Sequence, residues 1–176
     1  MSRIEEGQVG INPVLTDLIK LTENIISELK IDADKKLIVV NFEVENSIKE
    51  ILIDPAMVIH VVHNLLNNAI KYSPDKTEIN IKLHEVGKFL EFSIKDHGCG
   101  IPSNQTDKIG HRFFRATNAV NFDANGSGLG LYLAKSIVEA SGGELWFDTK
   151  EDEGSTFYFT LPLIGSAPKK GYKNLI

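Results

Sequence analysis

The sequence contains a single cysteine, Cys99, which excludes an internal disulfide and is typical of a reducing compartment. One cysteine also excludes a cysteine-based zinc site, and the five histidines show no metal-ligand spacing. No apolar run approaches the ~18 residues that span a bilayer, and no signal peptide is recognisable. We therefore expect a cytoplasmic domain without direct membrane insertion. Whether a longer parent protein is anchored in the inner membrane stays open.

Basic residues are scattered, and their only cluster, Lys169, Lys170 and Lys173, lies near the C-terminus. A nucleic-acid surface normally shows a basic patch, whereas this chain has a formal net charge of −5. Nucleic acid is therefore not an expected partner. With 176 residues, of which 42% are hydrophobic, the chain is long enough for one domain with a full core.

Hydrophobic periodicity predicts three helices and six strands. The helices are expected at 13–30, 54–72 and 128–141, and the strands at 35–44, 49–54, 77–83, 88–96, 144–149 and 155–163. A polar turn at 45–47 is expected to join the first two strands, and a hairpin turn at 85–88 the next two. Residues 97–127 form a long connection, which in a compact domain is usually a functional lid or disordered. This order predicts helices on one face of a mostly antiparallel sheet.

The helix expected at 54–72 carries one polar stripe beside its apolar stripe. His60, Asn64, Asn68 and Lys71 recur at helical spacing next to the apolar stripe. Two asparagines four residues apart offer amide oxygens to a hard cation, and a lysine one turn further on reaches phosphates that the cation bridges. The alternative is a solvated polar flank, although asparagine is a poor helix former.

A carboxylate and two glycines follow the strand at 88–96. Asp96 shares strand parity with Leu90, Phe92 and Ile94, so it points toward the core side and needs a hydrogen-bond donor. The exocyclic amine of a purine is such a donor, and Gly98 and Gly100 leave room for a flat ligand. The alternative is an Asx-turn made by Asp96 in an ordinary glycine turn.

Two further segments fall within or beside the long connection. Gly126, Gly128 and Gly130 precede a helix whose N-terminal amides suit an anion, although this segment taken alone favours a glycine-rich hinge. The segment 109–118 places Phe113, Phe114 and Arg115 where they dock against a partner or across a pocket, with Arg115 reaching a terminal phosphate. Ordinary loop packing is the alternative.

In order and spacing, four segments resemble the N, G1, F and G2 boxes of the ATP-binding domains of sensor histidine kinases, in the GHKL superfamily. They read NLLNNAIKYSP from Asn64, DHGCGIP from Asp96, RFFRATN from Arg112 and GSGLGLYLAKSIVEASGGELWF from Gly126, and GSTFYFTLPL follows. The resemblance implies an α+β fold, a two-layer α/β sandwich called the Bergerat fold. It has a mixed, mostly antiparallel sheet, helices packed on one face and a mobile ATP lid. It also implies a catalytic domain over 12–163, a remnant of a dimerisation and phosphoacceptor helix with its linker over 1–11, and a tail over 164–176.

The resemblance further implies ATP and Mg²⁺ as cofactors and assigns roles to individual residues. Catalysis and phosphate binding fall to Asn64, Asn68, Lys71 and Arg115, with Asn68 coordinating Mg²⁺. The remaining implied nucleotide-binding residues are Tyr72, Asp96, Gly98, Gly100, Ile101, Phe113, Gly126, Ser127, Gly128, Leu129, Gly130 and Thr156. Asp96 accepts the adenine amine, the glycine loop closes over the phosphates, and Thr156 joins the water network at the base of the pocket. Phe113 and Arg115 belong to the lid that meets the phosphoacceptor helices.

Three positions depart from the family pattern. His97 stands where the G1 box commonly has asparagine, and Gly110 stands where the F box often has an earlier phenylalanine. His60 occupies the place of the glutamate base found in relatives that hydrolyse ATP. The implied partners are the protein's own dimerisation hairpin and a response regulator, with the isolated domain a monomer. The alternatives are an ATP-driven conformational clamp, an anti-sigma-factor serine kinase and a catalytically degenerate nucleotide-binding module.

Overall fold

The computed structural model describes residues 10–45, 50–121 and 126–167. Its elements in chain order are β1 (Val14–Thr16), α1 (Leu18–Lys35), β2 (Val39–Val44), β3 (Ile51–Ile53), α2 (Pro55–Tyr72), β4 (Glu78–Val86), β5 (Phe89–Lys95), η1 (Ser103–Lys108), η2 (Ala119–Asn121), α3 (Gly130–Ala140), β6 (Leu145–Lys150) and β7 (Gly154–Pro162). Most of the helix remnant predicted at 1–11, part of the turn at 45–47, part of the lid and most of the tail at 164–176 lie outside the described residues.

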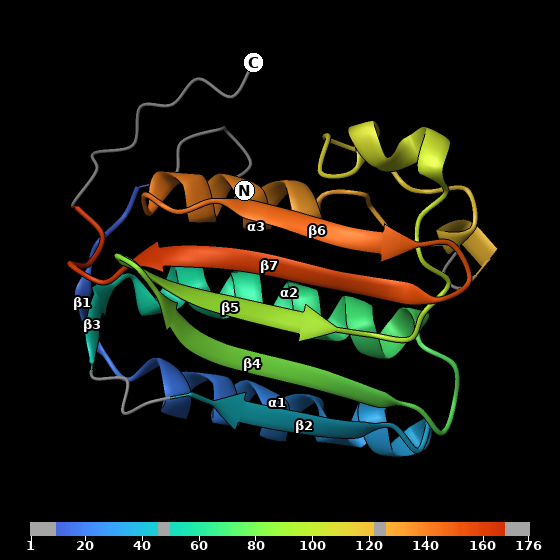
Figure 1. The fold of residues 1–176 in the computed structure, drawn as a ribbon, viewed down its shortest axis with the longest axis horizontal. Helices are drawn as coiled ribbons and strands as arrows, with labels where there is room; N and C mark the ends of the chain where they lie inside the picture. The colour runs from blue at the N-terminus through green and yellow to red at the C-terminus, as the bar shows by residue number, and fades with distance from the viewer. Residues whose placement is uncertain (1–9, 46–49, 122–125, 168–176) are drawn as a thin grey trace.

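Five strands form the main sheet in the order β2-β4-β5-β7-β6. β2 runs parallel to β4, and the other three pairs are antiparallel. Figure 1 shows the three α-helices behind this sheet, so the fold has two layers. The predicted α+β sandwich with a mixed, mostly antiparallel sheet is confirmed.

The core lies between the sheet and the helices. Alternate residues of β4, namely Ile79, Ile81 and Leu83, are fully buried, as strand periodicity requires. Phe92 of β5 stacks on Phe159 of β7 with ring centroids 4.9 Å apart. The apolar stripe of α2 packs into this core, and all of its residues are buried: Val58, Val61, Val62, Leu65 and Ala69.

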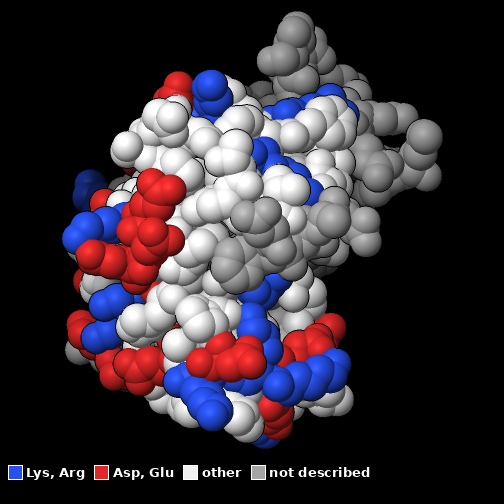
Figure 2. Space-filling model, turned by 90° about the vertical axis from the view of Figure 1, so that its right-hand side faces the viewer, with Lys and Arg blue, Asp and Glu red and all other residues white. Residues whose placement is uncertain are grey.

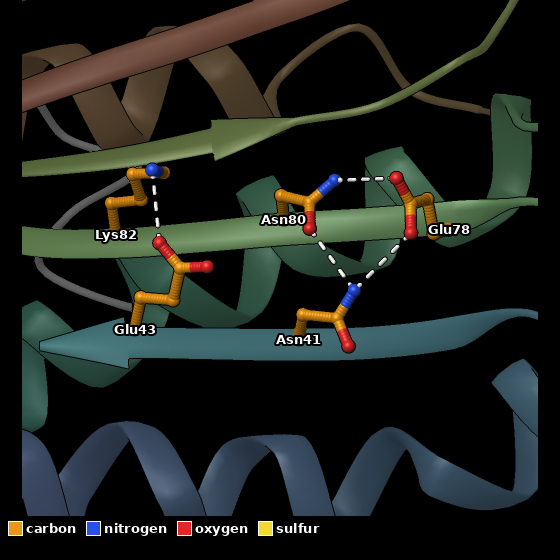
Figure 3. A network of polar contacts seen from close by, with 5 residues as sticks. All are labelled: Asn41, Glu43, Glu78, Asn80 and Lys82. Carbon is orange, nitrogen blue, oxygen red and sulfur yellow. Dashed lines mark hydrogen bonds and ion pairs between the residues drawn. The ribbon is translucent and has the colours of Figure 1, made fainter.

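The opposite face of the sheet is polar where β2 meets β4 (Figure 3). The parallel register sets Asn41 beside Asn80, and the Nδ2 of Asn41 donates to the Oδ1 of Asn80 over 3.0 Å. The amide of Asn80 in turn donates to Glu78, and Lys82 pairs with Glu43 at 2.9 Å. These cross-strand pairs satisfy polar groups on the solvent side, which leaves the apolar side of each strand for the helices.

Two predicted elements are wrong in detail. The helix expected at 13–30 begins only at Leu18, because the side chain of Asp17 caps it by accepting from the backbone N–H of Lys20. The residues before the cap form β1, and the helix continues to Lys35. The strands expected at 35–44 and 49–54 are shorter in the structure, where they are β2 and β3, and they lie in different sheets. β2 pairs with β4, whereas β3 pairs with β1 in a separate two-stranded sheet.

Other predicted elements are confirmed. Asp54 caps α2 by accepting from Met57, and Pro55 occupies the first turn. β4 and β5 form the expected hairpin, with Gly87 at φ +60° in its turn. Gly142 ends α3 at φ +88°. None of the helices in the described part of the chain is long and apolar enough to cross a membrane.

Candidate functional site

A cavity of about 290 Å³ opens at the end of the molecule where α2 ends and α3 begins. Its volume is close to the lower end of the ~300–1,000 Å³ typical of small-molecule sites. Most of the residues predicted from the sequence line it. They are Asn64, Asn68, Lys71, Tyr72, Asp96, Gly100, Ile101, Arg115, Gly126, Ser127, Gly128 and Gly130. Figure 2 shows acidic and basic side chains intermingled over this end of the molecule.

The α2 wall contains a buried polar atom without a partner. The Nδ2 of Asn64 is buried and has no hydrogen-bond partner among the described residues. The side chain lies against Gly130, the first residue of α3, where an added Cβ would stand 2.0 Å from the Oδ1 of Asn64. Because an unpaired buried donor is costly, the amide is suited to an acceptor brought into the cavity by a ligand.

The carboxylate of Asp96 forms the floor of the cavity at the end of β5. Two backbone amides donate to its Oδ1, Gly98 over 2.8 Å and Ser155 over 3.1 Å. The Gly98 bond is the Asx-turn expected as the alternative, and it occupies only one of the two oxygens. Oδ2 therefore keeps its capacity to accept from a ligand. Burial raises the pKa of the Asp96 carboxyl above its usual range, against the lowering effect of the two amides and of His97.

The two glycines after Asp96 are required by backbone packing. A Cβ on Gly98 would lie 2.9 Å from the Oδ1 of Asp96 and 3.0 Å from the carbonyl oxygen of Tyr72. Gly100 has φ +59°, and its Cβ would lie 2.0 Å from the carbonyl oxygen of Lys150. The sequence interpretation that these glycines leave room for a flat ligand is therefore incomplete. Gly100 lines the cavity, but Gly98 does not.

Main-chain and side-chain hydrogen bonds connect the described part of the lid to the rest of the site. The backbone N–H of Phe113 donates to the carbonyl of Gly128 over 3.1 Å. Gln105 and Thr117 bond to each other twice, and the amide of Asn118 donates to the carbonyls of Cys99 and Gly100. The Asn118 bonds join this segment to the turn that follows Asp96, and the Phe113 bond joins it to the glycine loop.

Phe113 itself points away from the cavity. Its side chain is 63% exposed, and the guanidinium of Arg112 lies 5.1 Å from its ring centroid. The next residue, Phe114, lines the cavity instead. Leu129 is the N-cap residue of α3, and it is not among the lining residues either.

The sequence prediction placed Thr156 at the base of the pocket, but Thr156 is not among the residues that line the cavity. Strand alternation sets it on the face of the sheet opposite Phe159 and Leu161, which are buried in the core. The neighbouring Ser155 lines the cavity, and its hydroxyl lies 2.8 Å from that of Thr149. The sequence contained a signal for this, because Ser155 alternates along the strand with the apolar residues Phe157, Phe159 and Leu161 and therefore shares their face.

Several lining residues were not predicted. They are Asn67, Cys99, Ile109, Gly110, His111, Ala116, Ala119, Leu131, Ser155 and Phe157. Asn67 lies between the two predicted asparagines, and helix periodicity alone places it to one side of their row. Burial, followed by the nearby carboxylates, raises the pKa of the Cys99 thiol, which disfavours the reactive thiolate form.

The described residues contain no group of three His, Cys, Asp or Glu side chains that could hold a metal ion. A cation at this site would therefore take most of its ligands from a bound molecule. Asn68 offers a hard amide oxygen on the cavity wall. This donor set fits Mg²⁺, which usually binds through one or two protein oxygens together with substrate phosphates and water.

A family profile described as "Histidine kinase-, DNA gyrase B-, and HSP90-like ATPase" matches residues 53–165, well over half of the chain. The chain belongs to this family. The sensor histidine kinase WalK of Bacillus subtilis (strain 168) is 40% identical over 112 residues, which cover 62% of this chain and 18% of WalK. The resemblance to histidine kinase catalytic domains is thereby confirmed, and this domain is the ATP-binding catalytic part of such kinases.

Solved structures share the fold of this chain. The catalytic domain of histidine kinase ThkA superposes with a TM-score of 0.76 at 26% identity, covering 86% of this chain and 96% of that one. A ThkA complex with the response regulator protein TrrA superposes with a TM-score of 0.72 at 23% identity, covering 87% of this chain and 42% of that one. ShkA in complex with AMPPNP superposes with a TM-score of 0.79 at 20% identity, covering 96% of this chain and 34% of that one. The chain spans between 18% and 37% of the length of its first three curated relatives.

Proposed function

We propose that this domain binds Mg-ATP in the cavity and transfers the γ-phosphoryl group to a histidine on a separate dimerisation hairpin of the same kinase. One observation carries the proposal: the cavity has an acceptor for a purine amine at one side, Oδ2 of Asp96, and an unpaired donor, Nδ2 of Asn64, at another. A purine nucleoside triphosphate has the matching groups at its two ends. The family membership supports ATP as the substrate.

Each cavity wall has a role in this proposal. Asp96 accepts the adenine amine, and Tyr72 and Ile101 line the purine pocket. Asn64, Lys71 and Arg115 contact the phosphates, together with the main-chain amides of the loop from Gly126 to Gly130. When bound, Mg²⁺ on Asn68 and the phosphates neutralises charge on the triphosphate. The protein's contribution is positioning and electrostatic stabilisation, which dominate phosphoryl transfer.

The transfer breaks the bond between the γ-phosphorus and its bridging oxygen and forms a bond from phosphorus to an imidazole nitrogen. ADP leaves with the electron pair of the broken bond. We propose that the exposed ring of Phe113 and the lid meet the hairpin that supplies the imidazole, because a large exposed aromatic beside the cavity mouth marks an interaction surface. A response regulator then takes the phosphoryl group, in line with the ThkA complex.

The test of the reaction combines this domain, a separately produced phosphoacceptor hairpin and radiolabelled ATP. We expect an acid-labile phosphate on the hairpin that depends on both proteins. Rapid ATP hydrolysis by the domain alone would instead favour a conformational clamp, and nucleotide binding without any transfer would favour a degenerate module. The sensor-kinase relatives favour the histidine kinase over the clamp and over an anti-sigma-factor serine kinase.

The metal assignment has its own test. Asn68→Ala removes the only amide oxygen that we assign to Mg²⁺ and leaves the purine contacts intact. We expect calorimetry to show that adding Mg²⁺ strengthens ATP binding in the parent domain but no longer does so in the variant. A Mg²⁺ effect of equal size in both proteins would contradict the assignment.

A further inference from the structure

Lys36 lies outside the cavity and closes the end of the helix that carries the cavity's polar residues. Its Nζ donates to the carbonyl oxygens of Ile70 at 2.9 Å and Lys71 at 3.0 Å, and also to that of Ser73. The lysine is the C-cap residue of α1, more than thirty positions earlier in the chain. Figure 1 shows that α1 and α2 end at the same side of the molecule, beneath the lid.

The sequence of α2 explains why an outside group is needed there. The last carbonyls of a helix have no intrahelical partner, and a residue with positive φ just after the cap commonly satisfies them. In α2 the cap is Ser73 and the next residue is Pro74, which has no N–H and cannot adopt positive φ. An ammonium group has three donors, and its charge is favourable at a helix C-terminus. Lys36 therefore substitutes for the missing main-chain cap.

The last turn of α2 is in direct contact with the purine side of the cavity. Lys71 and Tyr72 both line the cavity. The carbonyl oxygen of Tyr72 lies against Gly98, where an added Cβ would stand only 3.0 Å away. Gly98 in turn donates its N–H to Asp96. A shift of this turn would move the tyrosine wall relative to the carboxylate that faces the ligand.

We propose that Lys36 is a positioning residue for nucleotide binding, which acts by fixing the last turn of α2 against the Asp96 turn. The backbone of Lys36 supports the same arrangement, because its carbonyl accepts over 2.8 Å from the N–H of Lys76, four residues after the end of α2. The proposal rests on the proposed function, since the ligand that it positions is ATP. It adds a residue that touches neither the ligand nor the cavity.

The test compares two identical substitutions at adjacent positions. Lys36→Met keeps the length of the side chain but removes the three donors. Lys35→Met is the matched control, because the side chain of Lys35 is 68% exposed and pairs only locally with Asp32. Each protein is titrated with Mg-ATP in a calorimeter well below its unfolding temperature. We expect Lys36→Met to raise the Kd about tenfold at unchanged stoichiometry, since small displacements of binding groups have large effects. Lys35→Met should bind like the parent.

The stoichiometry separates positioning from folding. A purely structural role would lower the fraction of competent protein and leave the Kd of the remainder unchanged, which would overturn the proposal. Equal Kd values for the two methionine variants would also overturn it. If Lys36→Met does not fold, Lys36→Arg decides, because a planar guanidinium keeps the charge but cannot serve three converging carbonyls. A raised Kd at full stoichiometry supports the proposal, and an unchanged Kd overturns it. Absence of binding to the parent domain would instead refute the ATP site itself.

Discussion

Replacing Asp96 with asparagine reverses the hydrogen-bonding sense of one cavity atom while keeping the shape of the side chain. The amides of Gly98 and Ser155 both donate to the Oδ1 of Asp96. In Asp96→Asn the amide oxygen must take this position, because the nitrogen would face two donors. The Nδ2 of the asparagine is thereby forced to the place of Oδ2, where the purine amine is expected.

The size of the effect follows from that geometry. The Asp96→Asn variant loses a hydrogen bond from the purine amine to a charged acceptor, worth about 1.5–3 kcal/mol, which corresponds to a roughly 10–150-fold higher Kd for ATP. Inosine triphosphate carries an oxygen acceptor in place of the amine. It should bind the parent poorly and bind Asp96→Asn better than ATP does, because Nδ2 can donate to that oxygen. The preference between the two nucleotides is therefore expected to invert.

Calorimetric titration of both proteins with both nucleotides measures this inversion, and each protein serves as the control for the other. A loss of affinity for both nucleotides alike would show that the substitution merely damages the cavity. If Asp96→Asn binds ATP as tightly as the parent, or if the nucleotide preference does not change, the adenine contact assigned to Asp96 is wrong.

The same variant tests the electrostatics of the empty cavity. Burial raises the pKa of the Asp96 carboxyl, so the folded state binds this proton more tightly than the unfolded state does. The stabilisation from this group is complete below the unfolded pKa and is lost as the pH rises through the folded pKa. Relative to Asp96→Asn, the parent should therefore be least stable near neutral pH and gain stability in mild acid. Urea unfolding at the two pH values measures the difference, and the opposite slope would contradict the burial argument.

Two other substitutions address packing. Gly130→Ala should weaken ATP binding about tenfold without unfolding the domain. The new Cβ would lie 2.0 Å from the Oδ1 of Asn64 and must displace that side chain. If calorimetry shows unchanged affinity, Asn64 does not contribute to the site. Leu37→Gly should raise the free energy of unfolding by about 0.5–1 kcal/mol, because Leu37 has φ +54° and an exposed side chain. Urea unfolding checks this, and a destabilised variant would contradict the strain argument.

Elements whose pattern is local were predictable from the sequence. The start of α2 follows from Asp54 and Pro55, and the β4–β5 hairpin follows from alternation around Gly87. The pairing of β2 with β4 and of β3 with β1 was not predictable in this way, because strand partners depend on contacts far apart in the chain. The same reason explains β1, whose residues Val14 and Leu15 are exposed and fit a helix pattern as well as a strand.

The candidate site shows the same division. Residues on regular elements, such as Asn64, Asn68 and Asp96, were placed correctly at the cavity by their periodicity. Lid residues were harder, because a loop has no period: Phe113 points outward and Phe114 inward. No pattern in the sequence indicated the role of Lys36. Its role depends on where the ends of two helices meet, and that is a property of the packed fold.

The glycines of the site are explained by packing within the chain, whereas the amide of Asn64 is not. Gly98, Gly100, Gly128 and Gly130 each face protein atoms that an added Cβ would approach to 2.9 Å or less. Their spacing is therefore explained by packing within the chain, before any ligand is considered. The Nδ2 of Asn64 has no such explanation. Gly130 packs closely against this side chain, and the buried nitrogen finds no acceptor in the part of the chain that the structure describes. A buried polar atom held in place without a partner argues for a ligand more strongly than the glycine motif beside it.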